Sequence, residues 1–361
     1  MELSAQQANI RSDVQSALRS FFALRAQQLA DISGELPSVI AELSQLVLSG
    51  GKRLRPTFAY WGWHGAGGGD IDREAAVAAA ASLELIQACA LIHDDVMDGS
   101  LTRRGKPAMH RRFAALHREG FGRGDADSHG VAVAILLGDF ALAWADELLR
   151  GSGFSDSQLS AAWPIFEQMR TELMAGQYLD LASQAYGDHC VARARQVAVF
   201  KSAKYTIERP LHLGAALAAG SQDTMRAYTK YGIPLGEAFQ LRDDVLGIFG
   251  DPAKTGKPTG DDLREGKRTV LVAAAFERAD AAQRSVLERG LGDAGLTEAA
   301  VDKIREIFVE TGALAELEVM ISALTERALD ALEEAGTRGY IEPLALEALG
   351  ALAVATTARV S

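Results

Sequence analysis

Apolar residues recur along the chain with the spacing of amphipathic and buried α-helices. Residues 75–92 and 131–144 are the most apolar stretches, interrupted only by single polar residues such as Glu84, Gln87 and Asp139. The helix formers Ala, Leu, Glu and Arg are abundant, whereas alternating β-branched residues, which mark strands, are scarce. The pattern predicts about a dozen helices and no strand.

Glycine-rich and proline-containing segments separate the predicted helices. The breaks fall near Gly34 and at 49–56, 65–70, 120–130 and 250–268. We expect Asp72 to cap the long apolar helix and Pro210 to bend a later one. The predicted helices cover 1–34, 37–48, 55–64, 72–98, 131–149, 157–186, 191–220 and 224–249, and helices resume after 268.

No linker is long enough or biased enough to divide the 361 residues, and no repeat of fixed period is evident. We therefore expect one all-α domain over residues 1–361, a large helical bundle in which 1–34 form an N-terminal helical extension. Because polar residues interrupt the most apolar stretches, these are expected to be core helices and not integral membrane segments.

Charge and cysteine content narrow the function classes. The formal net charge of −11 makes nucleic acid an unexpected partner. Cys89 and Cys190 form no disulfide framework, and the polar N-terminus lacks the order of a signal peptide. A reduced, cytoplasmic compartment is the expectation.

A dense acidic cluster ends the apolar stretch at 75–92, in "LIHDDVMDGS". Asp94 and Asp98 are four residues apart, so they share a helix face and repel each other. A divalent cation offsets this repulsion, and Mg²⁺ favours one or two carboxylates together with substrate phosphates. A solvated acidic helix end is the competing interpretation.

Other charged residues favour the metal site over the solvated helix end. Arg103 and Arg104 follow the cluster and suit phosphate binding. A second acidic pair, Asp243 and Asp244, follows Gln240 in another apolar helix, within "FQLRDDVLGIFGD". Two such helices facing one cavity would hold Mg²⁺ ions around one diphosphate.

Cationic residues complete this pattern. Lys52 and Arg55, in "GGKRLRP", lie near a predicted helix start, where backbone N–H groups favour an anion. A glycine-containing polar loop at 250–268 is suited to closing over a bound phosphate. Further ammonium groups come from Lys201, Lys257 and Lys267.

Six motifs together resemble the trans-isoprenyl diphosphate synthases, the family of farnesyl and geranylgeranyl diphosphate synthases. They follow the family's order across residues 50–269. They read "GGKRLRP", "HDDVMDGSLTRRGKP", "MAGQYLD", "FKSAKYT", "FQLRDDVLGIFGD" and "TGKPTGDDLREGKRT". The resemblance implies the isoprenoid synthase fold, an all-α bundle around a central cavity, in a homodimeric prenyltransferase. Such an enzyme joins isopentenyl diphosphate to an allylic diphosphate.

The resemblance also implies roles for the acidic residues. Asp94 and Asp98 are expected to ligate Mg²⁺ on the allylic diphosphate, with Asp95 as an indirect or occasional ligand. Asp243, with Asp244 close by, is expected to hold a further ion. The implied cofactor is Mg²⁺, at three ions per active site.

Substrate contacts are implied in the same way. Arg103 is expected to grip the allylic diphosphate and Arg104 the isopentenyl diphosphate. Lys52, Arg55 and His64 are expected to complete the isopentenyl site. The residues expected on the allylic side are Lys201, Ser202, Gln240, Lys257 and Lys267. The residues expected to act directly in catalysis are Asp94, Asp98, Arg103, Lys201, Gln240 and Asp243.

Two positions depart from the family pattern. Gly247 stands where many relatives carry a third aspartate of the second acidic motif, and Ser202 replaces the more usual threonine. We expect weaker or rearranged Mg²⁺ binding at the first position and little change at the second, since the hydroxyl is kept.

Small residues precede the first motif. Cys89 and Ala90 stand where farnesyl-type relatives carry a bulky aromatic floor, and Ile86 lies one turn further back. We therefore expect an open tunnel for the growing chain and geranylgeranyl diphosphate (C20) as the product. Farnesyl or longer products, of C25 and above, are the alternatives, because Cys89 and Ala90 would set no length if they only pack a neighbouring helix.

Two other functions stay open. A terpene cyclase shares the all-α fold and an acidic first motif, but it needs no isopentenyl site, so Lys52, Arg55 and His64 count against it. A catalytically weak subunit of a heteromeric synthase is favoured only by Gly247, and the intact first motif counts against it.

Overall fold

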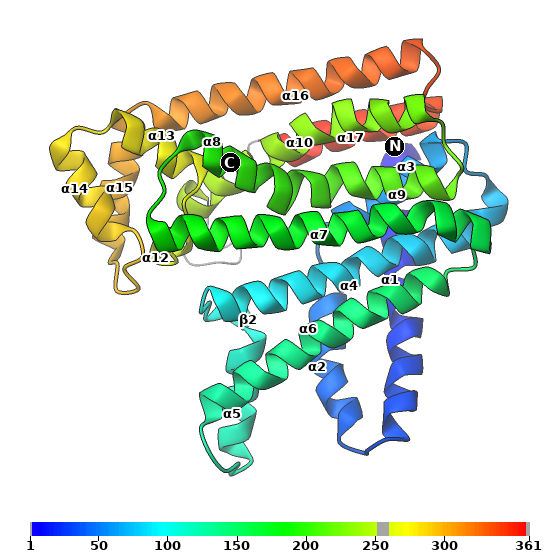
Figure 1. Ribbon diagram of the computed structural model, residues 1–361, viewed down its shortest axis with the longest axis horizontal. Coiled ribbons are helices and arrows are strands. Elements are labelled where there is room, and N and C mark those ends of the chain that lie inside the picture. The colour runs from blue at the N-terminus through cyan, green and yellow to red at the C-terminus, as the bar shows by residue number, and fades with distance from the viewer. Residues whose placement is uncertain (1, 251–259, 359–361) are drawn as a thin grey trace.

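Long antiparallel helices set the architecture of this protein (Figure 1). The computed structural model describes residues 2–250 and 260–358, and these residues are almost entirely helical. The long helices are α1 (Glu2–Ala30), α4 (Arg73–Met97), α6 (Ala126–Arg150), α7 (Asp156–Tyr186), α10 (Gln222–Phe249) and α16 (Ala313–Thr337).

Shorter elements complete the bundle. They are α2 (Leu36–Leu48), α3 (Leu54–Gly65), η1 (Asp70–Asp72), α5 (Met109–Glu119), α8 (Val191–Val197), η2 (Ala198–Glu208), α9 (Arg209–Leu217), α12 (Asp261–Arg264), α13 (Val270–Arg278), α14 (Ala281–Gly290), α15 (Glu298–Glu310) and α17 (Pro343–Thr357). The expected all-α class is confirmed. One small departure is a hairpin of β1 (Thr102–Arg103) and β2 (Lys106–Pro107), which the helical pattern did not predict.

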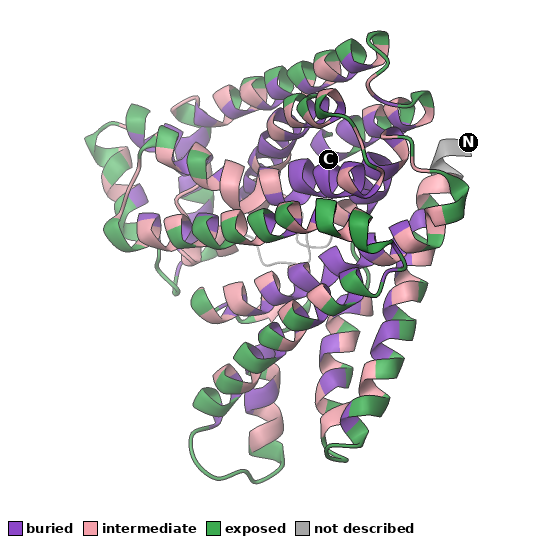
Figure 2. Cartoon of the chain, turned by 45° about the vertical axis from the view of Figure 1, so that its right-hand side comes forward, coloured by how far each residue is buried: buried purple, intermediate pink, exposed green. Residues whose placement is uncertain are grey.

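Helix α4 is the apolar centre of the bundle. It packs along α6 and also against α1 and α3, and most of its apolar residues are buried, as are most inward-facing positions of the long helices (Figure 2). Within the described ranges, 70–97 is the one segment long and apolar enough to cross a membrane, and 72% of its most apolar window is buried. Its hydropathy is therefore that of a core helix, as the interrupting polar residues indicated.

Apolar side chains gather in two clusters. The larger cluster joins helices α1 to α7 and α9 to the N-terminal half of α10, the end of α16 and α17, and its largest fully buried side chains include Trp61, Trp63 and Phe166. The smaller cluster joins the C-terminal half of α10 to α13, α14, α15 and α16 around Phe276 and Phe308. Helix α10 thus anchors the second acidic motif between the two clusters.

The stretch before Pro210 differs from the expected bent α-helix. Residues 198–208 form η2, a π-helix, and α9 begins after it with Pro210 in its first turn. A proline is tolerated there, because the first N–H groups of a helix have no intrahelical partner. A π-helical segment changes which side chains face inward, and η2 carries Lys201 and Ser202.

Helices α3 and α9 cross at unusually close range. A Cβ atom at Gly214 would lie 2.0 Å from the Ala59 carbonyl oxygen, and one at Gly62 would lie 2.4 Å from the Leu211 carbonyl oxygen. Both neighbours are backbone atoms, so they cannot move aside without shifting a helix.

We expect Gly214→Ala to lower the free energy of unfolding by about 1–3 kcal/mol, the usual cost of overpacking a core. Thermal unfolding followed by circular dichroism measures this change. Gly34→Ala is the matched control, because a Cβ atom there meets nothing within 4 Å. Equal unfolding midpoints for both variants would contradict the close crossing.

Candidate active site

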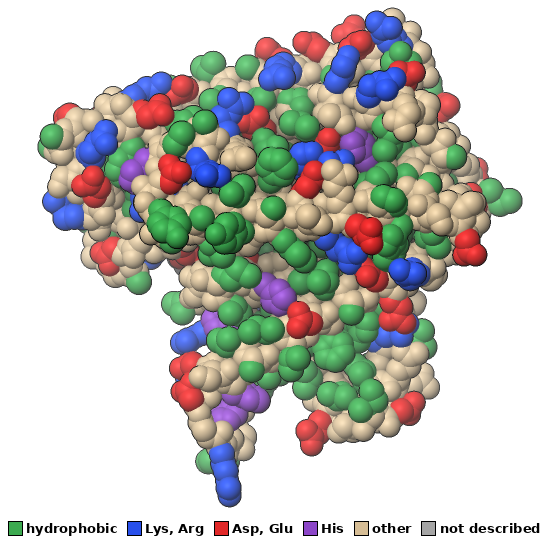
Figure 3. Space-filling view, viewed as in Figure 1, with side chains coloured by type: hydrophobic (Ala, Val, Ile, Leu, Met, Phe, Trp, Pro, Cys, Tyr) green, Lys and Arg blue, Asp and Glu red, His purple; other side chains and the backbone are tan. Residues whose placement is uncertain are grey.

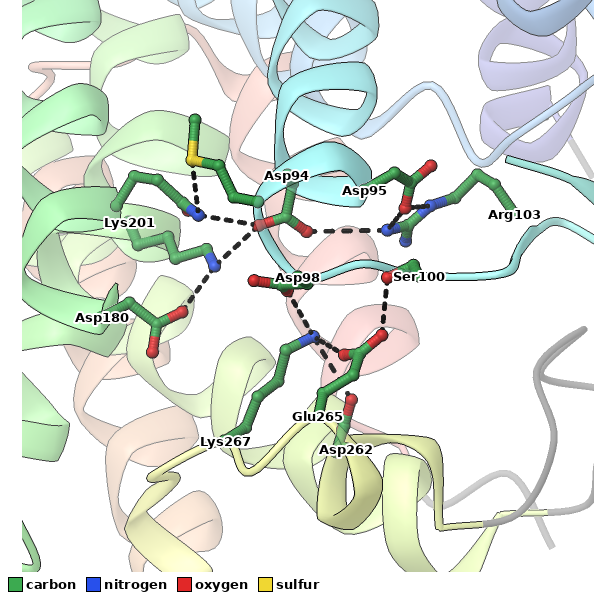
Figure 4. Close-up of polar contacts among 12 residues, drawn as sticks. Asp94, Asp95, Asp98, Ser100, Arg103, Asp180, Lys201, Asp262, Glu265 and Lys267 are labelled. Carbon is green, nitrogen blue, oxygen red and sulfur yellow. Dashed lines mark hydrogen bonds and ion pairs between the residues drawn. The ribbon is translucent and has the colours of Figure 1, made fainter. Parts of the chain in front are cut away.

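The first acidic cluster closes the C-terminal end of α4. Asp94 and Asp95 lie in its last turn, and Asp98 is the residue at which the helix ends, donating its backbone N–H to the Asp94 carbonyl at 2.8 Å. Figure 4 shows Asp94 and Asp98 turned toward Lys201 and Lys267, which come from distant segments.

Asp94 is surrounded by donors. It accepts hydrogen bonds from Lys201 Nζ at 3.1 Å and Gln177 Nε2 at 3.0 Å, and Arg103 lies 3.6 Å from its other oxygen. Burial raises the pKa of Asp94, but the positive charges of Lys201, Lys267 and Arg103 outweigh burial and bring the pKa to about 2. The carboxylate is therefore ionised at any physiological pH.

Asp98 has the opposite balance. Its side chain is 1% exposed, and neither carboxylate oxygen has a hydrogen-bond donor within the described residues; Lys267 Nζ is 3.5 Å away. Burial and the negative charge of Asp94 raise the pKa of Asp98 to about 6. Buried carboxylate oxygens without a donor are what a hard cation such as Mg²⁺ would satisfy, so this donor set fits the expected metal.

Asp95 points away from this pair. It is 2% exposed and accepts two hydrogen bonds from Arg103, one of them from Nε at 2.9 Å. Arg103 sits in β1, so the short hairpin holds its guanidinium across Asp95 and beside Asp94. This contact matches an indirect role for Asp95 better than direct metal ligation, because Arg103 already occupies its oxygen.

The second acidic cluster lies on α10. Asp243 is exposed, whereas Asp244 is 6% exposed and accepts a hydrogen bond from Gln240 Nε2 at 2.8 Å. Burial is the main reason that the pKa of Asp244 rises to about 8, and the negative charges of Asp262 and Asp243 add to it. The metal-free protein thus carries this carboxyl largely protonated at neutral pH.

Two lysines join the acidic residues of different helices. Lys201 Nζ bridges Asp94 to Asp180 of α7, which it meets at 2.6 Å. Lys267 Nζ lies 3.5 Å from both Asp98 and Asp262. In the described part of the chain no three metal-binding side chains converge on one point, and the two ammonium groups lie between the carboxylates.

The expected isopentenyl side lies at the start of α3. Arg55 Nη2 donates to Thr206 Oγ1 at 2.9 Å, and its guanidinium lies 4.2 Å from the ring centre of Tyr205. Arg104 donates to the Gly50 carbonyl at 3.0 Å, and Lys52 is exposed in the same loop. These three cations therefore border one loop, as the motifs predicted.

Arg53, to which the motifs assigned no role, anchors that loop. It is 5% exposed, has a left-handed backbone (φ 49°) and forms an ion pair with buried Glu84 of α4. It also donates to Gln15 Oε1 and to the Val47 carbonyl, each at 2.6 Å. The loop that carries Lys52 is thereby fixed to α1, α2 and α4.

His64 is not brought to this site. It lies near the far end of α3, about 13 Å along the helix axis from Arg55, since nine residues rise about 1.5 Å each. Its ring packs near Trp61, and burial lowers its pKa. The spacing of twelve residues after Lys52 did not predict the position of His64. The nine helical residues from Arg55 to His64 separate the two side chains along the axis of α3. Lys257 lies outside the described residues.

Three functional candidates were missed in the sequence. Gln177 and Asp180 contact Asp94 and Lys201, and Gln87 accepts a hydrogen bond from Tyr205 at 2.9 Å. Gln177 and Asp180 are three residues apart in "MAGQYLD", so their shared helix face was a readable signal. Gln87 breaks an apolar run seven residues before Asp94, which also places it on the Asp94 face.

Two of the expected length-determining residues, Ala90 and Cys89, lie on different faces of α4. Ala90 is half-buried and four residues before Asp94, so it shares the face of Asp94. Cys89 is 7% exposed, and its sulfur lies 3.7 Å from His93 Nδ1 on the side facing α6. Ile86 is 1% exposed. Ala90 is therefore the residue best placed to border a cavity.

The raised pKa values predict how metal binding depends on pH. Mg²⁺ competes with protons for carboxylates, and the pKa values of Asp98 and Asp244 are about 6 and about 8 in the metal-free protein. Affinity should therefore rise between about pH 6 and about pH 8, with release of protons. Titration with Mn²⁺, followed by the electron paramagnetic resonance of the free ion, measures this change. A pH-independent affinity would contradict it.

The acidic end of α4, with Lys201 and Lys267 between it and carboxylates of α7 and α12, is the arrangement expected of an all-α prenyltransferase. A family model described as "Polyprenyl synthetase" matches residues 37–308, well over half of the chain. The chain belongs to the polyprenyl synthetase family, and it is a trans-prenyl diphosphate synthase.

Individual relatives agree on the class and differ in product. A geranylgeranyl pyrophosphate synthase structure from Corynebacterium glutamicum, complexed with isoprenyl diphosphate and magnesium, is 43% identical with a TM-score of 0.93, over 97% of this chain and 98% of that chain. A short chain isoprenyl diphosphate synthase of Methanothermobacter thermautotrophicus is 31% identical (83% of this chain, 86% of the relative). A geranylfarnesyl diphosphate synthase of Aeropyrum pernix is 33% identical (80% and 84%).

Proposed function

We propose that this protein condenses isopentenyl diphosphate head-to-tail with an allylic diphosphate, with Mg²⁺ as cofactor, and releases diphosphate. The observation that carries the proposal is the pair of lysine bridges. Lys201 and Lys267 lie among carboxylates of α4, α7 and α12, where a diphosphate and its metal ions would exchange places with the internal ion pairs.

The residues around Asp94 suit the ionisation of an allylic diphosphate. Bound Mg²⁺, with Asp94, Asp98 and Asp243 as its holders, would neutralise charge on the departing diphosphate. Arg103 and the two lysines, freed from their carboxylate partners, donate to phosphate oxygens and stabilise the same charge. We propose that three Mg²⁺ ions bind in each active site.

The proposed condensation needs no basic group from the protein. The allylic C–O bond breaks, and both electrons leave with the diphosphate. The alkene of isopentenyl diphosphate, held by Lys52, Arg55 and Arg104, then attacks the allylic carbon and forms the new C–C bond. The resulting cation loses a proton to the released diphosphate. Ser202 and Gln240 supply dipoles beside the allylic carbon.

We propose geranylgeranyl diphosphate as the main product. Support comes from Ala90, a small side chain on the Asp94 face, which leaves space for a tail longer than that of farnesyl diphosphate. The matched relatives make products of several lengths, so only the product assay decides between C20 and longer chains.

One assay tests both statements. Purified protein is incubated with Mg²⁺, labelled isopentenyl diphosphate and each allylic primer in turn, and the products are separated by chain length. We expect elongation to stop at C20. Elongation of no primer would refute the synthase, whereas an end point at C15 or at C25 would refute only the product length.

The proposed active form is a homodimer in the cytoplasm. Apolar side chains gather on the face shown in Figure 3, along α6 and α7. Exposed large apolar residues on these two helices are Ile135 and Leu136 of α6 and Met174 and Tyr178 of α7, and exposed apolar surface favours a second copy. Analytical ultracentrifugation tests it: Leu136→Glu should give monomers, and an unchanged dimer would move the interface elsewhere.

A further inference from the structure

One carboxylate of α7 binds both ends of the last turn of the π-helix η2. In that turn the Arg209 N–H donates to the Lys204 carbonyl, five residues earlier. Glu172 Oε1 lies 3.4 Å from Lys204 Nζ and accepts a hydrogen bond from Arg209 Nη2 at 2.7 Å. Glu172 Oε2 accepts a second hydrogen bond, from Arg209 Nε at 2.7 Å. Bidentate pairs of this kind fix geometry as well as adding energy.

The two partners of Glu172 are five residues apart, a spacing that suits a π-helix. An α-helix turns about 100° per residue, so residues five apart point about 140° away from each other. The i→i+5 hydrogen bond of a π-helix instead brings such residues to neighbouring positions. Lys204 and Arg209 reach the same oxygen of Glu172 because η2 has this register. Their shared ion pair therefore stabilises the π-helix against rewinding to an α-helix.

Two glycines of the neighbouring helices leave room for the wider turns of η2. A Cβ atom at Gly176 of α7 would lie 2.4 Å from the Lys201 backbone nitrogen, and one at Gly236 of α10 would lie 2.4 Å from Ala203 Cα. Both neighbours are backbone atoms, so a side chain at either glycine would push η2 away. Gly176 is four residues after Glu172, which places both on the face of α7 that meets η2.

The register of η2 decides where Lys201 points. Lys201 lies three residues before Lys204, and its Nζ reaches Asp94 at 3.1 Å and Asp180 at 2.6 Å (Figure 4). Because α- and π-helices turn by different angles per residue, rewinding this segment would rotate Lys201 relative to Lys204 and to both carboxylates. The contacts of Glu172 with the end of η2 therefore bear on the position of the Lys201 ammonium group.

Glu172 is charged when it makes these contacts. Burial raises the pKa of Glu172, but hydrogen bonds and positive charges from Arg209 and Lys204 outweigh burial and lower the pKa below its usual value. The side chain of Glu172 is 13% exposed, and those of Lys204 and Arg209 are 14% and 10% exposed. Solvent ions therefore screen this cluster little, and each charge depends on its partners.

We propose that Glu172 is a positioning residue of the prenyl transfer site: through Lys204 and Arg209 it holds η2 in the register that places Lys201 beside the allylic diphosphate. The proposal rests on the proposed function, in which Lys201 donates to that diphosphate. Because Glu172 acts through Lys201, its loss should weaken diphosphate binding only as far as Lys201 is displaced.

Steady-state kinetics of Glu172→Gln test the proposal. The amide keeps the size of the carboxylate and removes its charge, so we expect kcat/KM for the allylic diphosphate to fall by about tenfold or more, the scale of loss for a displaced group. Glu167→Gln changes an exposed carboxylate of the same helix and should keep the wild-type value. Arg209→Lys keeps the charge but cannot bind with two parallel bonds, so it should give a smaller loss in a stably folded protein. Equal kcat/KM in Glu172→Gln and Glu167→Gln would overturn the proposal.

A double-mutant cycle separates action through Lys201 from a general structural role. Binding of inorganic diphosphate with Mg²⁺ is measured by isothermal titration calorimetry in the wild type, Glu172→Gln, Lys201→Ala and the double variant. We expect Glu172→Gln to weaken binding about tenfold in the wild-type background and less than about twofold in the Lys201→Ala background. Equal factors in both backgrounds would overturn the proposal and leave Glu172 as a stabiliser of the bundle. A wild type that elongates no primer would refute the proposed function instead, so the two failures are distinguishable.

Discussion

Asp94→Ala should reduce kcat/KM for the allylic diphosphate by at least about 10²–10³-fold, the usual loss on removing one group that stabilises transition-state charge. Asp94 is contacted by Lys201, Gln177 and Arg103. Its low pKa keeps it charged and ready for a metal ion. Without Asp94, a Mg²⁺ ion bound with the diphosphate would lack its carboxylate ligand from α4.

The variant is expected to fold. Lys201 keeps its ion pair with Asp180, and Asp98 loses the repulsion from Asp94. Steady-state kinetics with saturating Mg²⁺ and a thermal unfolding curve together separate chemistry from stability. Asp302→Ala, which removes an exposed aspartate on α15, is the matched control and should keep wild-type rates. Activity of Asp94→Ala within about tenfold of that control would refute its role as a ligand.

Local sequence signals predicted most of the helices. The break at Gly34 and the apolar run of α4 fall where the structure places them, whereas α12 (Asp261–Arg264) lies inside a stretch that was expected to be a loop. Helix α7 begins one residue earlier than predicted, because Ser155 and Gln158 form a reciprocal capping box at its start. Helix α6 also begins early, capped by Asp125 within a stretch that reads as a flexible loop.

The parts that were not predicted depend on contacts between distant segments. The π-helix η2 has no local signature, because its widened turns depend on packing against α7 and α10. Asp262 reads as one charge in an acidic loop until the approach of α12 places it beside Gly247. In the same way, Arg53 reads as a surface arginine and is buried against Glu84. The residue types in the sequence thus indicated the chemistry of the site. Which residues contact one another could be known only from the three-dimensional fold.

The face of α4 that carries Asp94 also bears on product length. In the proposed reaction, a growing tail that starts at the metal site would extend along this face, past Ala90 and toward Gln87. Cys89 faces α6 instead, because its sulfur contacts His93, whose ring fills the space over Gly138. Burial raises the pKa of the Cys89 thiol to about 12, so it acts as a small apolar group. Ala90 and Cys89 are therefore expected to differ in effect when enlarged.

Ala90→Phe should shorten the main product from C20 to C15. A phenyl ring one helical turn before Asp94, about 5.4 Å along the axis, occupies the space that the fourth isoprene unit needs. Chromatography of the dephosphorylated products measures the change, and Ala90→Ser, which adds little volume, should keep C20. Cys89→Phe must displace His93 from Gly138, so it should lower the unfolding midpoint more than Ala90→Phe does and shorten the product less. An unchanged product in Ala90→Phe would move the floor of the tunnel deeper, toward Ile86.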